Sequence, residues 1–310
     1  QLEQEQQSNI EAHDVLVSLL LGSLGSATTD ATQLLEAWES IQNNFDTLFI
    51  TENSIEQLKQ TILQLAVMGK LVSQIPEDEP ASELLKKIDE AKAKFINEKK
   101  IKKQKPLPKI IKKEEPYSLP HNWEWIRLGD ATNYGITKKI EASKVEEEIW
   151  VLELEDIEKN TSRLLKKVRF NERRFKSTKN IFNKSDVIYG KLRPYLDKVV
   201  IADEPGVCTT EMIPLKGYAG ILSEYLRWVM KSPYFIKYAN DSTHGMNLPR
   251  MGTEKARLAL IPLPPKEEQY RIVAKVNKLM TLCDQLKSSL AMAQTTQLKL
   301  TDSIVEKAIG

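Results

Sequence analysis

Between positions 272 and 304 the chain carries apolar residues in a heptad pattern, which predicts one long helix with an apolar stripe. These residues recur at alternating steps of four and three, at Ile272, Val276, Leu279, Cys283, Leu286, Leu290 and Ala293, and after polar Gln297 at Leu300 and Ile304. Such a helix is about 50 Å long at 1.5 Å per residue, and its stripe needs a partner helix. Three prolines within 261–265 fix φ and remove N–H donors directly before it. A globular body therefore ends there, and we place the C-terminal helix at 263–310.

The N-terminal region repeats this spacing. Apolar residues follow it from position 34 to 48 and again from 55 to 65, before Gly69. We therefore expect a helical region over residues 1–95 that pairs with the C-terminal helix in an antiparallel, coiled-coil-like arm. The side chains predicted to contact a partner helix or a second copy of the chain are Leu34, Trp38, Ile41, Phe45, Ile272, Val276, Leu279, Leu286 and Leu290.

The net charge of +2 conceals an uneven distribution along the chain. Residues 1–90 carry a net charge of −12, whereas residues 91–116 carry +7. Lysines and prolines dominate residues 96–116, which we interpret as a linker. A solvated tether and a segment that contacts phosphates both remain open for it. An anionic partner is expected to meet the middle of the chain rather than its acidic end.

Residues 117–262 have the pattern of one globular domain. It opens with Trp123 and Trp125, whose rings we expect to anchor a short extended segment. Strand-like stretches follow at 148–154, 186–189, 198–202 and 212–215, and helical stretches at 219–231 and 233–240. Together they predict an α+β fold, in which one mixed globular domain is flanked by long heptad-patterned helices.

The chain lacks the residue patterns of common enzymes and metal sites. It has two cysteines far apart and three histidines, so we expect no structural zinc and a reduced, cytoplasmic setting. A phosphate-binding glycine loop, an HExxH motif, a GxSxG elbow and a methyltransferase tetrapeptide are missing. Asp156, Glu158 and Lys159 only superficially resemble a nuclease motif. The longest apolar run is too short to span a bilayer. We expect no catalysis, no bound cofactor, no bound metal and no membrane attachment.

Two stretches combine basic, aromatic and amide side chains in a way that suits an anion. The first covers residues 185–198, and the second covers residues 242–250. Lysine and arginine bind phosphates, arginine can pair with guanine, and asparagine can pair with adenine. A basic hairpin packed into the core, and ordinary turn chemistry, remain open alternatives. The candidate DNA-binding residues are Lys138, Lys139, Tyr189, Lys191, Arg193, Tyr195, Lys198, His244, Asn247 and Arg250.

Four segments in order resemble the specificity (S) subunit of type I restriction-modification enzymes. They are LQLAVMGKLV at 63–72 with DEPASELL at 78–85, LPHNWEW at 119–125, GKLRPY at 190–195, and IPLPP at 261–265 with EQYRIV at 268–273 and LMTLCD at 279–284. The resemblance implies a target recognition domain that reads one half of a split site in double-stranded DNA. It also implies helices that dock two methyltransferase (M) subunits and restriction (R) subunits. These partners would bring S-adenosylmethionine, Mg²⁺ and ATP.

The chain departs from this family in size. Such subunits usually carry two recognition domains, whereas this sequence carries one. Either the chain is the first half of a longer protein, or it is a half-size subunit that pairs with its own copy and reads an inverted repeat. Two other hypotheses remain: a coiled-coil scaffold that binds only protein, and an unrecognised metal-dependent nuclease.

Overall fold

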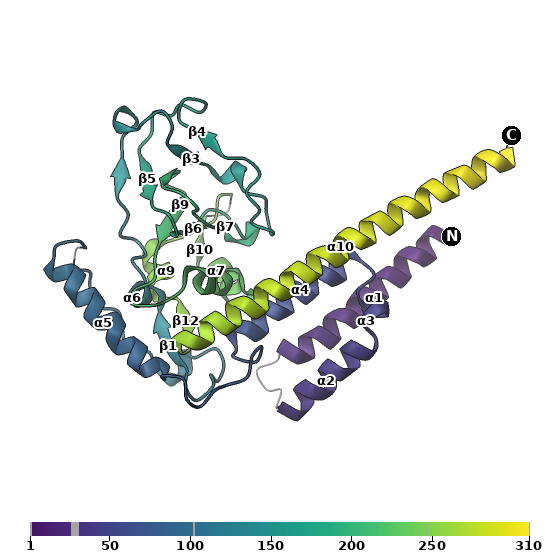
Figure 1. The fold of residues 1–310 in the computed structure, drawn as a ribbon, viewed down its shortest axis with the longest axis horizontal. Coiled ribbons are helices and arrows are strands. Elements are labelled where there is room, and N and C mark those ends of the chain that lie inside the picture. The colour runs from purple at the N-terminus through teal and green to yellow at the C-terminus, as the bar shows by residue number, and fades with distance from the viewer. Residues whose placement is uncertain (1, 26–30, 102, 246, 310) are drawn as a thin grey trace. The chain divides into compact units, whose positions relative to one another are not determined.

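The computed structural model describes residues 2–25, 31–101, 103–245 and 247–309, which form two compact units (Figure 1). The first unit joins the residues up to Ala66 with those from Ala274 onward, and the second unit spans Val67–Val273. Because these units are defined by contacts alone, the domain boundaries predicted at 95, 116 and 262 remain predictions.

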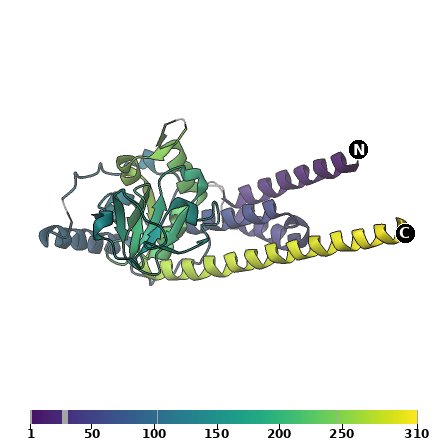
Figure 2. The ribbon, with the colours of Figure 1, turned by 90° about the horizontal axis from the view of Figure 1, so that it is seen from above.

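The first unit is helical and contains an antiparallel helix pair. Its elements are α1 (Leu2–Gly25), α2 (Ala31–Asn43), α3 (Phe45–Leu48), α4 (Glu52–Val67) and α10 (Lys266–Ile309) from Ala274 onward. Figures 1 and 2 show α4 alongside α10. The Lys59 ammonium lies 2.6 Å from the Asp284 carboxylate, and that of Lys287 lies 3.2 Å from Glu52. An earlier residue of α4 thus meets a later residue of α10, which confirms the predicted antiparallel arm.

The heptad stripe of α10 is covered only along its first part. Ile272, Val276 and Cys283 are buried, and Leu279, Leu286 and Leu290 are half-buried. From position 291 to 307 every side chain is exposed, including Leu300 and Ile304. The apolar stripe of α10 extends beyond α4, because α4 has 16 residues and α10 has 44. Lys287 of α10 already pairs with Glu52, the first residue of α4.

The N-terminal contact residues have mixed environments. Ile41 is buried, and the ring of Phe45 packs on Phe49 with centroids 4.7 Å apart. Trp38 and Phe45 remain 36% and 38% exposed, and the assignment of these residues as contacts to a partner helix or a second copy stays a prediction. The side chain of Leu34 lies outside the described residues.

The second unit combines four small sheets with short helices. A five-stranded sheet has the order β2-β5-β8-β3-β4, in which only β3 and β8 are parallel, and a three-stranded antiparallel sheet has the order β7-β6-β9. The pairs β1-β12 and β10-β11 are separate antiparallel ladders.

The strands are β1 (Glu124–Arg127), β2 (Lys139–Ile140), β3 (Trp150–Leu152), β4 (Val168–Arg169), β5 (Lys179–Phe182), β6 (Val187–Gly190), β7 (Val199–Ile201), β8 (Gly206–Cys208), β9 (Met212–Leu215), β10 (Thr243–His244), β11 (Arg250–Met251) and β12 (Leu260–Leu263). The helices are α5 (Ala81–Asn97), α6 (Leu128–Ala131), α7 (Ser223–Lys231), α8 (Pro233–Asp241) and α9 (Thr253–Leu258), with 3-10 turns at Lys112–Glu114, Ala142–Lys144, Leu154–Asp156 and Pro194–Leu196. These elements confirm the predicted α+β class and the predicted strands and helices.

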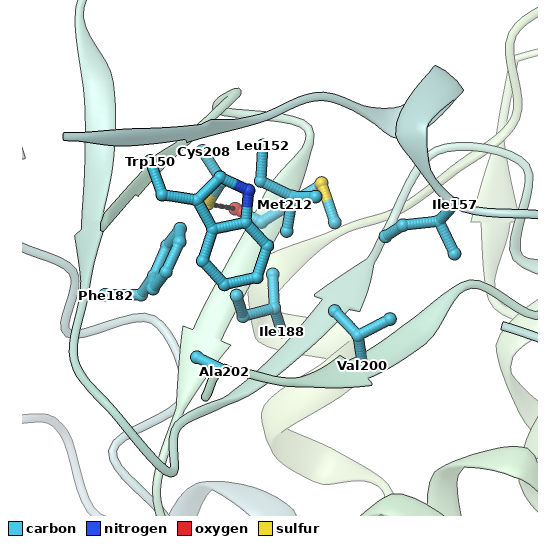
Figure 3. Packing of buried hydrophobic residues seen from close by; sticks show 9 residues of the cluster. All are labelled: Trp150, Leu152, Ile157, Phe182, Ile188, Val200, Ala202, Cys208 and Met212. Atoms are coloured by element: carbon cyan, nitrogen blue, oxygen red, sulfur yellow. Dashed lines mark hydrogen bonds between the residues drawn. The ribbon is translucent and has the colours of Figure 1, made fainter. Parts of the chain in front are cut away.

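One apolar cluster joins the two larger sheets (Figure 3). Trp150 and Phe182 come from the five-stranded sheet, and their rings meet edge to face with centroids 5.1 Å apart. Ile188 and Val200 come from the three-stranded sheet and close the cluster. Strand β3 is buried on both faces, because Trp150 points into this cluster while Val151 packs in a second one. A continuous apolar run rather than an alternating one is what such a strand requires.

Gly206 in β8 leaves room for the Phe182 ring. A Cβ atom at this position would meet that ring and would lie 2.7 Å from the carbonyl oxygen of Trp150. We expect Gly206→Ala to lower the free energy of unfolding by roughly 2–3 kcal/mol, because overpacking a rigid core forces the backbone to shift. Urea unfolding followed by tryptophan fluorescence measures the loss. Gly252→Ala is the matched control, since a Cβ there meets nothing within 4 Å. Equal losses in both variants would contradict this account of β8.

A buried joint fixes the start of α10 within the second unit. The indole of Trp123 donates to the Glu268 carboxylate at 2.9 Å, and the Gln74 amide donates to its other oxygen at 2.6 Å. Burial raises the pKa of Glu268. Arg271 forms an ion pair with Asp78 one turn further along. Three of the four segments that carry the family resemblance therefore meet at one place, and the expected anchoring role of Trp123 is confirmed.

Candidate nucleic-acid interface

The two basic stretches predicted as anion contacts lie side by side in the second unit. The N–H of Arg193 donates to the carbonyl oxygen of Pro249 at 2.7 Å, and the N–H of Met251 donates to that of Lys191 at 3.1 Å. A further antiparallel bridge links Leu192 to Arg250. Main-chain hydrogen bonds thus join the segment after β6 to the β10-β11 hairpin, and together they form one edge, here called the paired-loop edge (residues 191–198, 243–245 and 247–251).

A turn with unusual backbone geometry exposes two of the predicted side chains. Arg193 and Asp197 have φ of 51° and 47°, on either side of the 3-10 turn Pro194–Leu196. This left-handed conformation is strained for residues with a Cβ, so surrounding contacts must hold it. Tyr195 is 50% exposed at the turn, and Arg193 is exposed beside it.

A buried ion pair holds the residue that ends this turn, Asp197. The Lys231 ammonium donates to the Asp197 carboxylate at 2.5 Å, and both side chains are 5% exposed. The same ammonium donates to the Ser162 hydroxyl at 2.8 Å and to the Asn160 carbonyl oxygen at 3.0 Å. Burial raises the pKa of Asp197 to about 6, while Lys231 acts in the opposite direction. The ion pair that supports the turn is therefore buried, whereas the side chains of Arg193 and Tyr195 in the turn are exposed.

The remaining candidates on the hairpin differ in how free they are. His244 and Asn247 are exposed. The guanidinium of Arg250 lies 3.0 Å from both carboxylate oxygens of Glu211, and this bond raises the pKa of Arg250. A guanidinium already held by a carboxylate has fewer donors left for a ligand. Arg250 is thus held by Glu211, and its assignment as a DNA contact stays a prediction.

Of two further candidates, Tyr189 is buried and Lys198 is half-buried. Tyr189 is only 3% exposed and its ring packs on Phe235 with centroids 5.8 Å apart, so its assignment as a surface contact is corrected. The Lys198 ammonium donates to the carbonyl oxygen of Leu154 at 2.8 Å, and burial lowers its pKa. In both cases helices and loops distant in sequence cover a side chain that local pattern placed outside.

Lys138 and Lys139 are exposed but lie elsewhere. Lys139 belongs to β2, at the edge of the five-stranded sheet, and pairs with Asn180 of β5. The structure brings neither lysine to the paired-loop edge. Three cations at that edge make no ion pair with a described residue, namely Lys191, Arg193 and Lys198, and of these the Lys198 ammonium is held by the Leu154 carbonyl oxygen.

Sequence reasoning missed three residues that organise this edge. Asp197, Lys231 and Glu211 carry ordinary charges, and nothing in the sequence places them together. The left-handed residues gave no signal either, because neither is a glycine or asparagine. Within the described residues no group of three or more His, Cys, Asp or Glu side chains could hold a metal ion. Among the described helices, none is both long and apolar enough to cross a membrane.

The edge offers cationic and amide donors on a main chain held by hydrogen bonds, with Arg193 and Asn247 exposed and Lys191 half-buried. Lys191 and Arg193 supply charge-assisted hydrogen bonds, and Asn247 supplies an amide that can pair with a base edge. Donors of these types, without acidic partners of their own, suit phosphate oxygens and the acceptors of DNA grooves.

Comparisons with known proteins give a consistent set of relatives. No family model matches the chain. Over the whole chain it is 38% identical to the type I restriction enzyme EcoAI specificity subunit of Escherichia coli and 35% identical to the EcoEI specificity subunit of the same species, covering 54% of each. The EcoDI specificity subunit of Escherichia coli is 30% identical over 65% of the chain and 44% of its own length. The chain therefore spans about half the length of the curated relatives that it matches.

Solved structures show the same fold at lower identity. The HsdS subunit from Thermoanaerobacter tengcongensis aligns with a TM-score of 0.51 at 24% identity, over 61% of this chain and 49% of that one. A chain from a structure on complex assembly and conformational transition of the type I R-M system aligns with a TM-score of 0.56 at 24% identity, over 62% of this chain and 51% of that one.

Proposed function

The chain belongs to the family of type I restriction enzyme specificity subunits, and on this premise we propose that it is a DNA-recognition subunit that reads one half of a two-part site. The observation that carries the proposal is the whole-length match to the EcoAI specificity subunit. The paired-loop edge supports it, because exposed Arg193 and Asn247 and half-buried Lys191 are donors of the kinds that contact phosphates and base edges.

We further propose that catalysis resides in partner subunits. Methyltransferase subunits would supply S-adenosylmethionine and transfer its methyl group to adenine, and restriction subunits would supply ATP-driven, Mg²⁺-dependent cleavage. This chain would dock them through its helices and work in the cytoplasm. A second copy of the chain is a further proposed partner, and the exposed stripe of α10 after Leu290 supports it, because apolar heptad positions favour helix pairing.

The test is to map methylated adenines by long-read sequencing in cells of the source organism, with and without the gene. We expect deletion to abolish methylation at one split motif. An inverted-repeat motif would identify a self-paired half subunit, and unlike halves would identify a second recognition domain. If the system methylates DNA and no motif depends on the gene, the chain is not its specificity subunit. The alternative, a coiled-coil scaffold that binds only protein, would then be favoured.

A further inference from the structure

The lysine-rich segment before β1 is held against the globular body. We call residues 103–116 the basic strap. Its prolines at 106, 108 and 116 restrict the backbone, and its five lysines are exposed. These lysines are Lys103, Lys105, Lys109, Lys112 and Lys113.

Two buried arginines hold the strap by its main chain. The guanidinium of Arg127 donates to the carbonyl oxygen of Pro108 at 2.7 Å, and that of Arg257 donates to the carbonyl oxygen of Lys105 at 3.3 Å. Both arginines are 4% exposed. Arg127 also binds the carboxylate of Glu114 at 3.1 Å. Three fixed points over about ten residues rule out the solvated tether for this part of the linker, because a tether has no fixed points.

The five lysines of the strap outnumber its two acidic residues, Glu114 and Glu115. Glu114 is used internally, since Arg127 and the N–H of Ile111 occupy its oxygens. None of the five strap lysines forms an ion pair with a residue that the structure describes. Elsewhere in the second unit many cations are paired, such as Arg163 with Glu158 and Arg173 with Asp156. The anchors thus fix the backbone of the strap and leave its ammonium groups to solvent.

The strap lies next to the base of the β10-β11 hairpin. An open pocket of about 620 Å³ has Pro108, Glu114 and Pro116 of the strap on one side and Tyr238 and Ser242 on the other. Ser242 directly precedes Thr243, the first residue of the hairpin. The strap and the paired-loop edge are therefore neighbours within the same compact unit.

We propose that the basic strap is a second DNA-contacting element, which binds backbone phosphates beside the half-site read by the paired-loop edge. The inference rests on the proposed DNA-recognition function. Lysine binds phosphate without reading sequence, so the strap adds affinity rather than specificity. An acidic protein surface fits less well, because the centres of protein interfaces are depleted in lysine and enriched in aromatic residues, and the strap has no aromatic side chain.

The test compares the salt dependence of DNA binding by the full chain and two variants. The strap variant is Lys109→Gln/Lys112→Gln/Lys113→Gln. The control is Lys86→Gln/Lys87→Gln on α5, where both lysines are exposed but paired with Glu83 and Glu79. The probes are a fluorescent duplex selected from a random pool by the wild-type chain and the same duplex with scrambled sequence. Fluorescence anisotropy between 50 and 300 mM salt gives each slope.

We expect the strap variant to lower the slope of log K against log salt by about 2 to 3, because each phosphate contact contributes about 0.9. Its affinity falls by roughly tenfold or more at 0.1 M salt for both probes, while the preference for the selected duplex is unchanged. The control keeps the wild-type slope. A Lys109→Arg/Lys112→Arg/Lys113→Arg variant keeps the charge and restores the slope, which separates loss of contact from loss of fold.

Other outcomes overturn the inference in distinguishable ways. A wild-type chain that prefers its selected duplex, together with an unchanged slope in the strap variant, removes the strap from the DNA and leaves the recognition function intact. An unchanged slope with lost binding of the methyltransferase subunit assigns the strap to an acidic protein partner. A wild-type chain that prefers no duplex refutes the recognition function, and the strap inference falls with it.

Discussion

Arg193→Gln is expected to lower the affinity of the chain for its selected duplex by roughly 10- to 100-fold, as follows from the 1–3 kcal/mol typical of a bidentate base contact. The guanidinium is exposed, and its one described contact is a long 3.5 Å bond to the Asn247 carbonyl oxygen. Its backbone N–H is held independently by Pro249. The substitution therefore removes donors without loosening the turn.

The measurement is the dissociation constant on duplexes that differ from the selected one at single base pairs. We expect Arg193→Gln to relax the preference at one position, whereas Lys191→Gln should weaken all duplexes alike and lower the salt slope by about one. Arg163→Gln is the matched control, since Arg163 is 70% exposed on the same unit but paired with Glu158 at 3.0 Å. An Arg193→Gln variant with wild-type affinity and wild-type preference would leave Arg193 a structural residue of the turn.

Lys231→Met is expected to lower the free energy of unfolding by about 3–5 kcal/mol at pH 7.5. The substitution removes three hydrogen bonds and leaves the Asp197 carboxylate buried without its cation. Because that ion pair underlies the turn, the same variant should also lose preference for the selected duplex. Urea unfolding followed by tryptophan fluorescence measures the first effect, and anisotropy with the two probes measures the second.

The loss in Lys231→Met should shrink as the pH falls towards 5. Burial already raises the pKa of Asp197 to about 6, and removing Lys231 takes away the main interaction that lowers it. The folded variant then binds a proton that the unfolded chain, with a carboxyl pKa near 3.9, releases, so its stability rises as pH falls through this window.

The double variant Lys231→Met/Asp197→Asn serves as the control for this pH dependence. It removes the charge and keeps a residue type that tolerates the left-handed conformation. We expect it to be more stable than Lys231→Met at pH 7.5 and to lack the rise in stability towards pH 5 that protonation of Asp197 gives to Lys231→Met. A loss of less than about 1 kcal/mol in Lys231→Met, or an equal loss at both pH values, would contradict the role assigned to the pair.

The local sequence pattern was enough to predict the helices and strands of this fold, but not which residues cover them in the tertiary structure. The heptads predicted α10 and its antiparallel partner, and β-rich stretches predicted β3, β6, β7 and β9, because both signals depend on near neighbours in sequence. The length over which α10 is covered depends on where α4 begins, which the pattern of α10 does not contain. The stripe was therefore predicted to be longer than its covered part.

The site shows the same limit at the level of single residues. Tyr189 and Tyr195 belong to one short motif, yet Phe235 of α8 buries the first while the second stays exposed. The sequence gives no reason to distinguish Arg193 from Arg250, but in the structure the guanidinium of Arg250 is bound by the Glu211 carboxylate. Each difference arises from a residue far along the chain, so only the tertiary structure separates a contact residue from a supporting one.

The main-chain hydrogen bonds of the paired-loop edge do not depend on side-chain identity, which bears on how its exposed residues can vary. Arg193 is tied to Pro249, and Lys191 to Met251, through peptide groups that every non-proline residue possesses. Side chains at positions 193, 195, 244 and 247 can therefore be exchanged, by drift or by an engineer, while the scaffold that presents them persists. If this edge reads DNA as proposed, we expect libraries randomised at these four positions to yield altered target preferences.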